Sequence, residues 1–499
     1  MSRNDAERSD NVEPAVASRP AFTEGSVLRH ITVMTATATT GLIALFLVDL
    51  IDLYFLSLLG EVELAAAVGY AGSILFFTTS VCIGLAIAMA ALVARAIGAN
   101  ETARARRYVV HVSAVALLVT VPFAIAIWLS IPALLDLLGA KGRTHELATD
   151  YLRIIIPSMP VLALAMGSGG ALRAVGAARL AMASTLAGGL VNAVLDPILI
   201  FGLDLGVEGA ALASVAARFA VLAVGAYGVI VRQKLLGRFK PRAFGRDVMR
   251  IAEVAGPAIL TNVATPFGNA YVVTSMAAFG DDAVAGFSII GRIIPVAFGV
   301  VFALSGAVGP VIGQNFGAGK FERIRRTLID GLKLSTAMVA LASLALFMLQ
   351  DQIAAAFGAS PGATELIGFF STFIAILFAF AGAQFIANAA FNNLGFPLWS
   401  TYVNWARVTI GTIPLVWLGG VWLGPSGVLL GQAIGGVIFG VGAYYAAWKL
   451  CVVQRAAGRQ PKTHDRMFRV PLSAQTVYRG WVGLFGHEGS KVDHPNKQS

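Results

Sequence analysis

Long apolar stretches separated by short polar segments follow one another from about residue 31 to residue 453. Most of them have twenty or more residues, the length at which an α-helix crosses the hydrocarbon core of a bilayer. They do not show the ten-residue alternation of apolar and polar side chains that marks a transmembrane β-barrel. The pattern predicts an all-α membrane protein with 12 transmembrane helices: 29–57, 65–97, 108–138, 147–172, 180–203 and 207–233, then 249–279, 283–316, 327–357, 362–393, 397–422 and 426–453.

The composition agrees with this interpretation and disfavours other classes of protein. Hydrophobic residues make up 57% of the chain and charged residues only 13%, whereas about a quarter of a soluble protein is charged. The two cysteines, Cys82 and Cys451, lie inside apolar runs, so a disulfide scaffold is not expected, and neither a structural metal nor a cofactor is indicated. A membrane enzyme is disfavoured because the sequence shows no catalytic motif.

The net charge of +10 comes from basic residues that cluster in every second loop, a pattern that indicates membrane topology rather than nucleic-acid binding. The intervening loops hold little beyond Lys141 and Arg143, with acids such as Glu61 and Asp281. By the positive-inside rule the basic loops face the cytoplasm, and an even number of spans places both termini there. We expect a multi-pass protein of the cell inner membrane that contacts lipids and no nucleic acid.

The same pattern divides the chain into five segments. These are a flexible cytoplasmic N-terminal tail at 1–26, a first lobe at 27–233, a basic cytoplasmic linker at 234–248, a second lobe at 249–455 and a polar, basic cytoplasmic tail at 456–499. The first segment has no apolar region typical of a cleaved signal peptide. The linker is long and polar enough to let the two lobes move.

An internal duplication relates the two sets of six helices. The stretch VARAIGANETARARR at 93–107 recurs as IGQNFGAGKFERIRR at 312–326, and this alignment places Gly98 on Gly317. Other glycines keep nearly the same offset: Gly60 with Gly280, Gly176 with Gly395, and Gly206 and Gly209 with Gly424 and Gly427. Two repeats of six spans begin and end on the same side, which is typical of transporters with a solute path between parallel halves.

Ionisable side chains inside the spans are the candidate functional residues, because a charge in mid-bilayer costs about 2.5–3.5 kcal/mol. The first half supplies Asp49, Asp52 and Asp196, and the second half has no acid deep in a span. Asn192 and Asp196 share one helix face, and Pro197 frees the backbone carbonyl four residues earlier. Such oxygen-rich polarity suits H⁺ or Na⁺, so Asp52, Asn192 and Asp196 could hold Na⁺.

Asp49 and Asp52 lie three residues apart on a common helix face. Two carboxylates this close in a low dielectric should not both carry charge. A purely structural, hydrogen-bonded role stays open for each acid, and Asp49 could simply line water near the site.

At this point the residues resemble the multidrug and toxic compound extrusion (MATE) family over about 29–453. The segment DLYFLSLLGEVELAAAVG at 52–69 is similar to the family's first-span pattern of an Asp, a Gly eight residues on and a Leu-Ala-Ala run. The segment NAVLDPILIFGLDLGVEGAALASV at 192–215 is similar to its Asn-x-x-x-Asp-Pro and Gly-x-x-Gly-Ala-Ala elements. The paired Gly-Ala loops after the second and eighth spans also fit.

The resemblance implies two six-helix lobes that face each other in a V and export small organic, often cationic, amphiphiles in exchange for H⁺ or Na⁺. It assigns the coupling role to Asp52, places Asn192 and Asp196 in a polar cluster that Ser214 completes, and leaves Asp49 as an additional acid. Some members carry acids in the seventh and tenth spans, where this chain has Thr265 and Ala381. The chain therefore resembles the DinF-like branch, which couples through the first lobe.

The sequence predicts an H⁺-coupled antiporter that is functional as a monomer and recognises its solutes loosely through an apolar cavity. The alternative is a flippase for a lipid-linked saccharide, which would line its cavity with cations. Arg173 and Arg407 are the candidates for that role, and both could instead lie at the cytoplasmic side.

Overall fold

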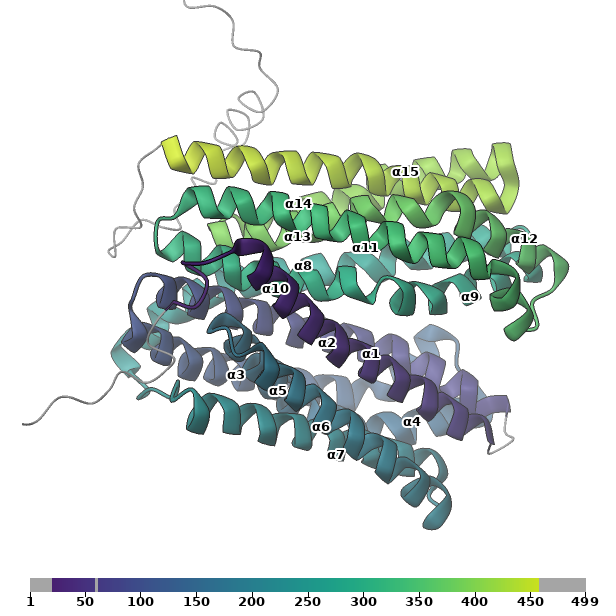
Figure 1. The fold of residues 1–499 in the computed structure, drawn as a ribbon. Coiled ribbons are helices and arrows are strands. Elements are labelled where there is room, and N and C mark those ends of the chain that lie inside the picture. Colours follow the sequence, from purple (N-terminus) through teal and green to yellow (C-terminus); the bar gives the residue numbers. More distant parts are fainter. Residues whose placement is uncertain (1–19, 59–61, 457–499) are drawn as a thin grey trace, which may run out of the picture.

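The computed structural model describes residues 20–58 and 62–456, except the side chains at 47–58, 62, 65 and 456. No strand occurs in these ranges, so the predicted all-α class is confirmed (Figure 1). The helices of the first half are α1 (Val27–Leu58), α2 (Val62–Gly98), α3 (Thr102–Leu138), α4 (Gly142–Ile155), α5 (Met159–Ala174), α6 (Ala178–Pro197) and α7 (Gly206–Tyr227).

The second half begins with α8 (Pro241–Ala277) and contains several short π and 3-10 turns that join helices end to end. Its other helices are α9 (Asp281–Ala297), α10 (Gly299–Gly317), α11 (Phe321–Ala356), α12 (Pro361–Phe369), α13 (Phe378–Leu394), α14 (Pro397–Ala406) and α15 (Ile413–Ala456). The turns used below are η2 (Ile156–Ser158), η3 (Ile198–Gly202), η6 (Ala375–Leu377) and η7 (Arg407–Thr412).

These helices make the 12 predicted passes. Within the described ranges, nine helical stretches are long and apolar enough to cross a membrane. The last of them, Pro397–Arg455, has 59 residues and makes two passes, because Gly424 inside it has a φ of 61° that no helix accommodates. Together with α1 and α8 this gives twelve, and the predicted limits lie within several residues of the observed ones.

The backbone repeats the duplication that the sequence shows. The 3-10 turns η2 and η6 are related by the same offset as Gly98 and Gly317, and each leads directly into the next helix, α5 or α13. Gly176 and Gly395, which follow these two helices, have φ values of 88° and 91°. Both therefore end a helix in the left-handed conformation that glycine adopts without strain. The two halves gather on opposite sides of the molecule, purple to teal against green to yellow (Figure 1).

One end of the bundle, which we call the basic end, carries the loops that the sequence marks as basic: 98–102, 174–178, 232–241 and 317–321. The two halves meet there through α2 and α10. A Cβ added to Gly98 would stand 2.0 Å from the carbonyl oxygen of Gln314, and one added to Gly317 would stand 2.1 Å from that of Arg95. Two glycines related by the duplication thus let the backbones of the halves touch.

The predicted flexible tail at 1–26 is wrong for residues 20–26, which we call the N-terminal segment. Phe22 is only 3% exposed, and its amide donates to Oε1 of Gln314 over 2.9 Å. Arg323 donates to the carbonyl oxygens of Phe22, Glu24 and Gly25 over 2.9–3.0 Å. The segment is held because the second half supplies side-chain donors for its otherwise unpaired backbone carbonyls.

The interhalf linker is likewise anchored rather than loose. The helix α8 begins at Pro241, inside the predicted linker, and the preceding residues 233–240 lie against α3. Leu235 is fully buried, and the amide of Lys240 donates to Nε2 of His111 over 3.2 Å. Local polarity in the sequence did not reveal this docking on a distant helix, and the predicted freedom of the halves to move stays a prediction.

Candidate functional site

Asn192 and Asp196 form a buried polar pair on α6. The Nδ2 group of Asn192 donates to Oδ2 of Asp196 over 2.7 Å, and the two residues are 4% and 0% exposed. The pair stands just before Pro197, where α6 gives way to the π turn η3. The helical spacing that the sequence indicated thus produces a direct contact, and the bond to an amide donor helps to satisfy a carboxyl group that burial would otherwise penalise.

The other predicted residues lie on the two helices that pack against α6. Ser214 is a half-buried residue of α7. Asp49 and Asp52 belong to α1, which also packs on α6, but their side chains lie outside the described residues. Asp52 stands six residues before the end of α1, and Asp196 six residues before the end of η3. The fold therefore gathers the three helices but leaves the cluster itself a prediction.

The second half carries a neutral amide network that sequence reasoning missed. Asn404 on α14 accepts from Nε2 of Gln384 on α13 over 3.0 Å and donates to Oδ1 of Asn388 over 3.2 Å. All three residues are less than 9% exposed. The amide-rich run QFIANAAFNN at 384–393 was the available signal. Thr265 and Ala381 lie on α8 and α13, so neither brings an acid into this region.

A buried ion cluster fastens α8 to the first half at the basic end. Asp247 on α8 is fully buried and lies 2.7 Å from Nδ1 of His111 and 2.8 Å from Nε of Arg107. Because the amide of Lys240 can only donate to Nε2 of His111, the neutral imidazole carries its proton on Nδ1 and donates it to Asp247. Arg107 and His111 both lie at the polar start of a span, where the hydropathy of the sequence does not predict a contact with α8.

The N-terminal segment bridges the halves as well as binding the second one. Gln314 on α10 accepts from the amide of Phe22 and donates to the carbonyl oxygen of Ala174 over 2.8 Å. A Cβ on Gly176 would stand 3.2 Å from the ring of Phe22. We call this set of Phe22, Gln314, Ala174 and Gly176 the basic-end seal.

Four arginines of the spans differ in how their guanidinium groups are satisfied. Arg218 on α7 donates to the carbonyl oxygen of Ile155 and to Oγ of Ser158 over 3.1 and 2.8 Å. Arg95 donates to the carbonyl oxygen of Asn392 across the two halves. Arg173 and Arg407, the two candidates for an anion-binding role, are largely buried, and their side chains contact no hydrogen-bond or ion-pair partner in the described part of the chain.

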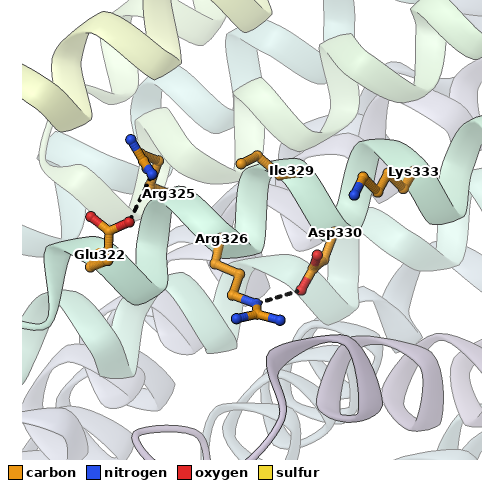
Figure 2. Close-up of a pocket in the computed structure, with 6 residues that line it drawn as sticks. All are labelled: Glu322, Arg325, Arg326, Ile329, Asp330 and Lys333. Atoms are coloured by element: carbon orange, nitrogen blue, oxygen red, sulfur yellow. Dashed lines mark ion pairs between the residues drawn. The ribbon is translucent and has the colours of Figure 1, made fainter.

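A hollow of about 280 Å³ lies along one face of α11 at the basic end (Figure 2). It is lined by Glu322, Arg325, Arg326, Ile329, Asp330 and Lys333. Two ion pairs, Arg325 with Glu322 at 2.9 Å and Arg326 with Asp330 at 3.5 Å, neutralise most of its charge. Because it lies on the second half and away from Asp196, it is not part of the candidate site. No cluster of metal ligands occurs among the residues described, and Asp52 lies outside them.

Comparisons with known proteins agree with the duplicated helical fold. The MatE family model matches residues 38–198 and 257–418, two ranges whose first residues keep the offset of the internal duplication. The FAD transporter of Shewanella oneidensis is 29% identical over 421 residues, which cover 82% of this chain and 92% of that protein. The multidrug export protein MepA of Staphylococcus aureus is 30% identical over 208 residues, which cover 41% of this chain and 45% of MepA.

Solved structures show the same fold at lower identity. The Vibrio cholerae MATE transporter VcmN in its bent form superposes with a TM-score of 0.81 at 24% identity, over 86% of this chain and 98% of that one. An outward-facing multidrug resistance MATE family transporter of the MOP superfamily gives 0.82 at 22% identity, over 88% and 98%.

Proposed function

This chain belongs to the MatE family of membrane transporters and is not an enzyme, and from that premise we propose that it is a secondary active antiporter of the cell inner membrane that exports small organic solutes in exchange for protons. The basic end faces the cytoplasm, both termini lie there, and a single chain forms the transport unit. Within the residues described, the amide network of the second half contains no acid. This agrees with membership of the DinF-like branch of the family, which couples through acids of the first lobe.

The buried pair of Asn192 and Asp196 is the observation that carries the proposal. A carboxyl group that is 0% exposed is stable in its ionised form only while donors such as Nδ2 of Asn192 compensate it. Taking up a proton removes the charge that this bond stabilises. Protonation therefore alters the end of α6, where the π turn η3 already departs from regular helix.

In this mechanism Asp52 on the adjoining helix α1 receives the proton from the external side, and the change spreads to Asn192, Asp196 and Ser214. Proton and solute then favour different shapes of the first half. Each can drive the other only because its affinity differs between the two states. Na⁺ at Asp52, Asn192 and Asp196 is the alternative coupling ion.

The structure is closed at the basic end, so the solute must enter from the cytoplasm in a different state. The contact of Gly98 and Gly317 and the basic-end seal join the halves there. We propose that both part when the protein opens inward, and that they close again before the solute leaves on the other side.

Two solute classes are candidates. Cationic amphiphiles follow from the family resemblance and from MepA, which matches only 41% of this chain. An anionic flavin nucleotide follows from the Shewanella protein named as an FAD transporter, which matches 82%. Arg173 and Arg407, which have no partner among the described residues, favour the second class.

The test uses proteoliposomes loaded with a fluorescent solute under an imposed pH gradient. Gradient-driven export should fall to the passive leak in Asp52→Asn and Asp196→Asn, because neither amide can carry the proton. Asp136→Asn serves as control, since that side chain is 72% exposed at the end of α3. Undiminished export in both site variants would sink the coupling role, and export that follows a sodium gradient alone would replace H⁺ by Na⁺.

A further inference from the structure

Arg173 lies where the two halves face each other near the basic end. It occupies the last turn of α5, and its side chain reaches the second half: a Cβ on Gly306 of α10 would stand 3.9 Å from its Cδ and Nε. Its Nη1 lies 3.3 Å from the point where a Cβ on Gly169 would stand. Gly169 is one turn earlier on α5, so the guanidinium folds back toward the membrane interior, and the missing side chain of Gly169 leaves it room.

The guanidinium of Arg173 has no partner among the described side chains, unlike that of Arg218 on α7. Arg218 has a carbonyl and a hydroxyl acceptor, whereas Arg173 has no hydrogen-bond or ion-pair partner among the side chains that the structure describes. A largely buried cation without a partner is costly and is uncommon unless it has a function. Arg407 is also unpaired, but no contact places it between the halves.

The position of Arg173 relative to the basic-end seal indicates when it would find a partner. The next residue, Ala174, accepts the hydrogen bond of Gln314, and Gly176 contacts Phe22. Arg173 therefore stands directly behind the contacts that must part for inward opening.

We propose that Arg173 binds an anionic group, a phosphate or carboxylate, of the exported solute as it enters from the basic end. A guanidinium suits this role because its planar fork donates two parallel hydrogen bonds to such a group. The inference rests on the proposed export function and names its substrate class: organic anions rather than purely cationic amphiphiles.

Flavin mononucleotide and riboflavin provide the test, because they share one ring system and differ by a phosphate. Their binding to the purified full-length protein in a neutral detergent is followed by quenching of flavin fluorescence. The wild type should prefer flavin mononucleotide. Arg173→Gln should lose about tenfold to a hundredfold of this preference, the range expected for hydrogen bonds to a charged group, and bind riboflavin as before. Arg179→Gln, an exposed neighbour at the same end, should change neither.

Three outcomes would overturn the proposal: no preference in the wild type, an unchanged preference in Arg173→Gln, or an equal loss of both flavins. If Arg173→Gln does not fold, Arg173→Lys decides, because it keeps the charge and loses the fork. The preference of Arg173→Lys for flavin mononucleotide should fall by about threefold or more. An unchanged preference would show that the two parallel hydrogen bonds of the guanidinium are not used.

The source of the anion is separated in the same assay. Neutral detergent removes anionic lipid headgroups, and inorganic phosphate at millimolar concentration should not displace flavin mononucleotide if the organic part also binds. Displacement by phosphate alone would overturn the solute assignment. Flavin binding is measured without an ion gradient. A failure of proton coupling in vesicles would therefore contradict the proposed antiport and leave the binding role of Arg173 unchanged.

Discussion

The two halves of this protein share a scaffold and differ in the chemistry that it carries. The 3-10 turns η2 and η6 and the glycines at 176 and 395 repeat at one common offset. In the first half a buried carboxyl group, Asp196, bonds to an amide. In the second half the buried polar groups of α13 and α14 are amides and hydroxyls that bond to one another. Duplication thus preserved what packing requires, while titratable groups diverged.

The segments that lead into the two halves show the same relation at the basic end. Residues 20–26 precede α1 and are bound by α10 and α11 of the second half. Residues 233–240 precede α8 and lie against α3 of the first half. Each half therefore holds the leading segment of the other. This reciprocal docking joins the halves at the basic end.

The largest expected effect distinguishes the chemistry of the halves. Asp196→Asn should lower pH-driven export by about a hundredfold or more, because it removes the only titratable member of the buried pair while an amide can still accept from Asn192. Asn388→Ala in the second half should lower it only a few-fold, since no proton is bound there. Rates come from the initial slope of dye efflux. Equal losses in the two variants would erase the functional difference between the halves.

The next effect concerns the leading segments. Replacing a buried phenylalanine by alanine destabilises protein interiors by about 3–5 kcal/mol. Because Phe22 packs between the halves, Phe22→Ala should destabilise the closed state and open the basic end. A single cysteine at Ala178, in a background without the two native cysteines, should then react with a maleimide at least about tenfold faster. Phe219→Ala on α7, a residue that is 54% exposed, is the matched control. If the cysteine at position 178 reacts as slowly in Phe22→Ala as in the wild type, the N-terminal segment does not hold this end closed.

A smaller effect tests what the halves have in common. Gly98→Ala and Gly317→Ala each place a Cβ about 2 Å from a backbone oxygen of the other half, so each should lower stability by about 1–3 kcal/mol. Gly442→Ala on α15 has nothing within 4 Å of its Cβ and should be neutral or slightly stabilising. Thermal unfolding in detergent measures all three variants. A loss in only one of the paired variants would contradict a shared role for the two glycines.

The smallest effect separates the two acids of α1. Asp49→Asn should reduce pH-driven export less than about threefold, because Asp52 and Asp196 carry the proton in the proposed mechanism. Asp52→Asn is measured in parallel. If Asp49→Asn alone abolishes export, the coupling role moves one turn along the helix, and the first half holds more titratable chemistry than we propose.

The sequence by itself determined the class, the twelve passes and the duplication, because hydropathy and glycine positions are local properties of each helix. It also determined the contact of Asn192 with Asp196, since a spacing of four residues fixes neighbours on a helix face. The site cluster around Asp52 and Ser214 stays a prediction, resting on helix proximity alone.

Only the tertiary structure decided which distant residues meet. The docking of Phe22 on Gln314 joins residues 292 positions apart, and the bond of His111 to Asp247 joins residues 136 apart. Arg173 was visible in the sequence, but its place between the halves, without a partner and behind a seal, depends on how α5 packs on α10. Such contacts depend on packing between whole helices, and no periodicity within one helix encodes them.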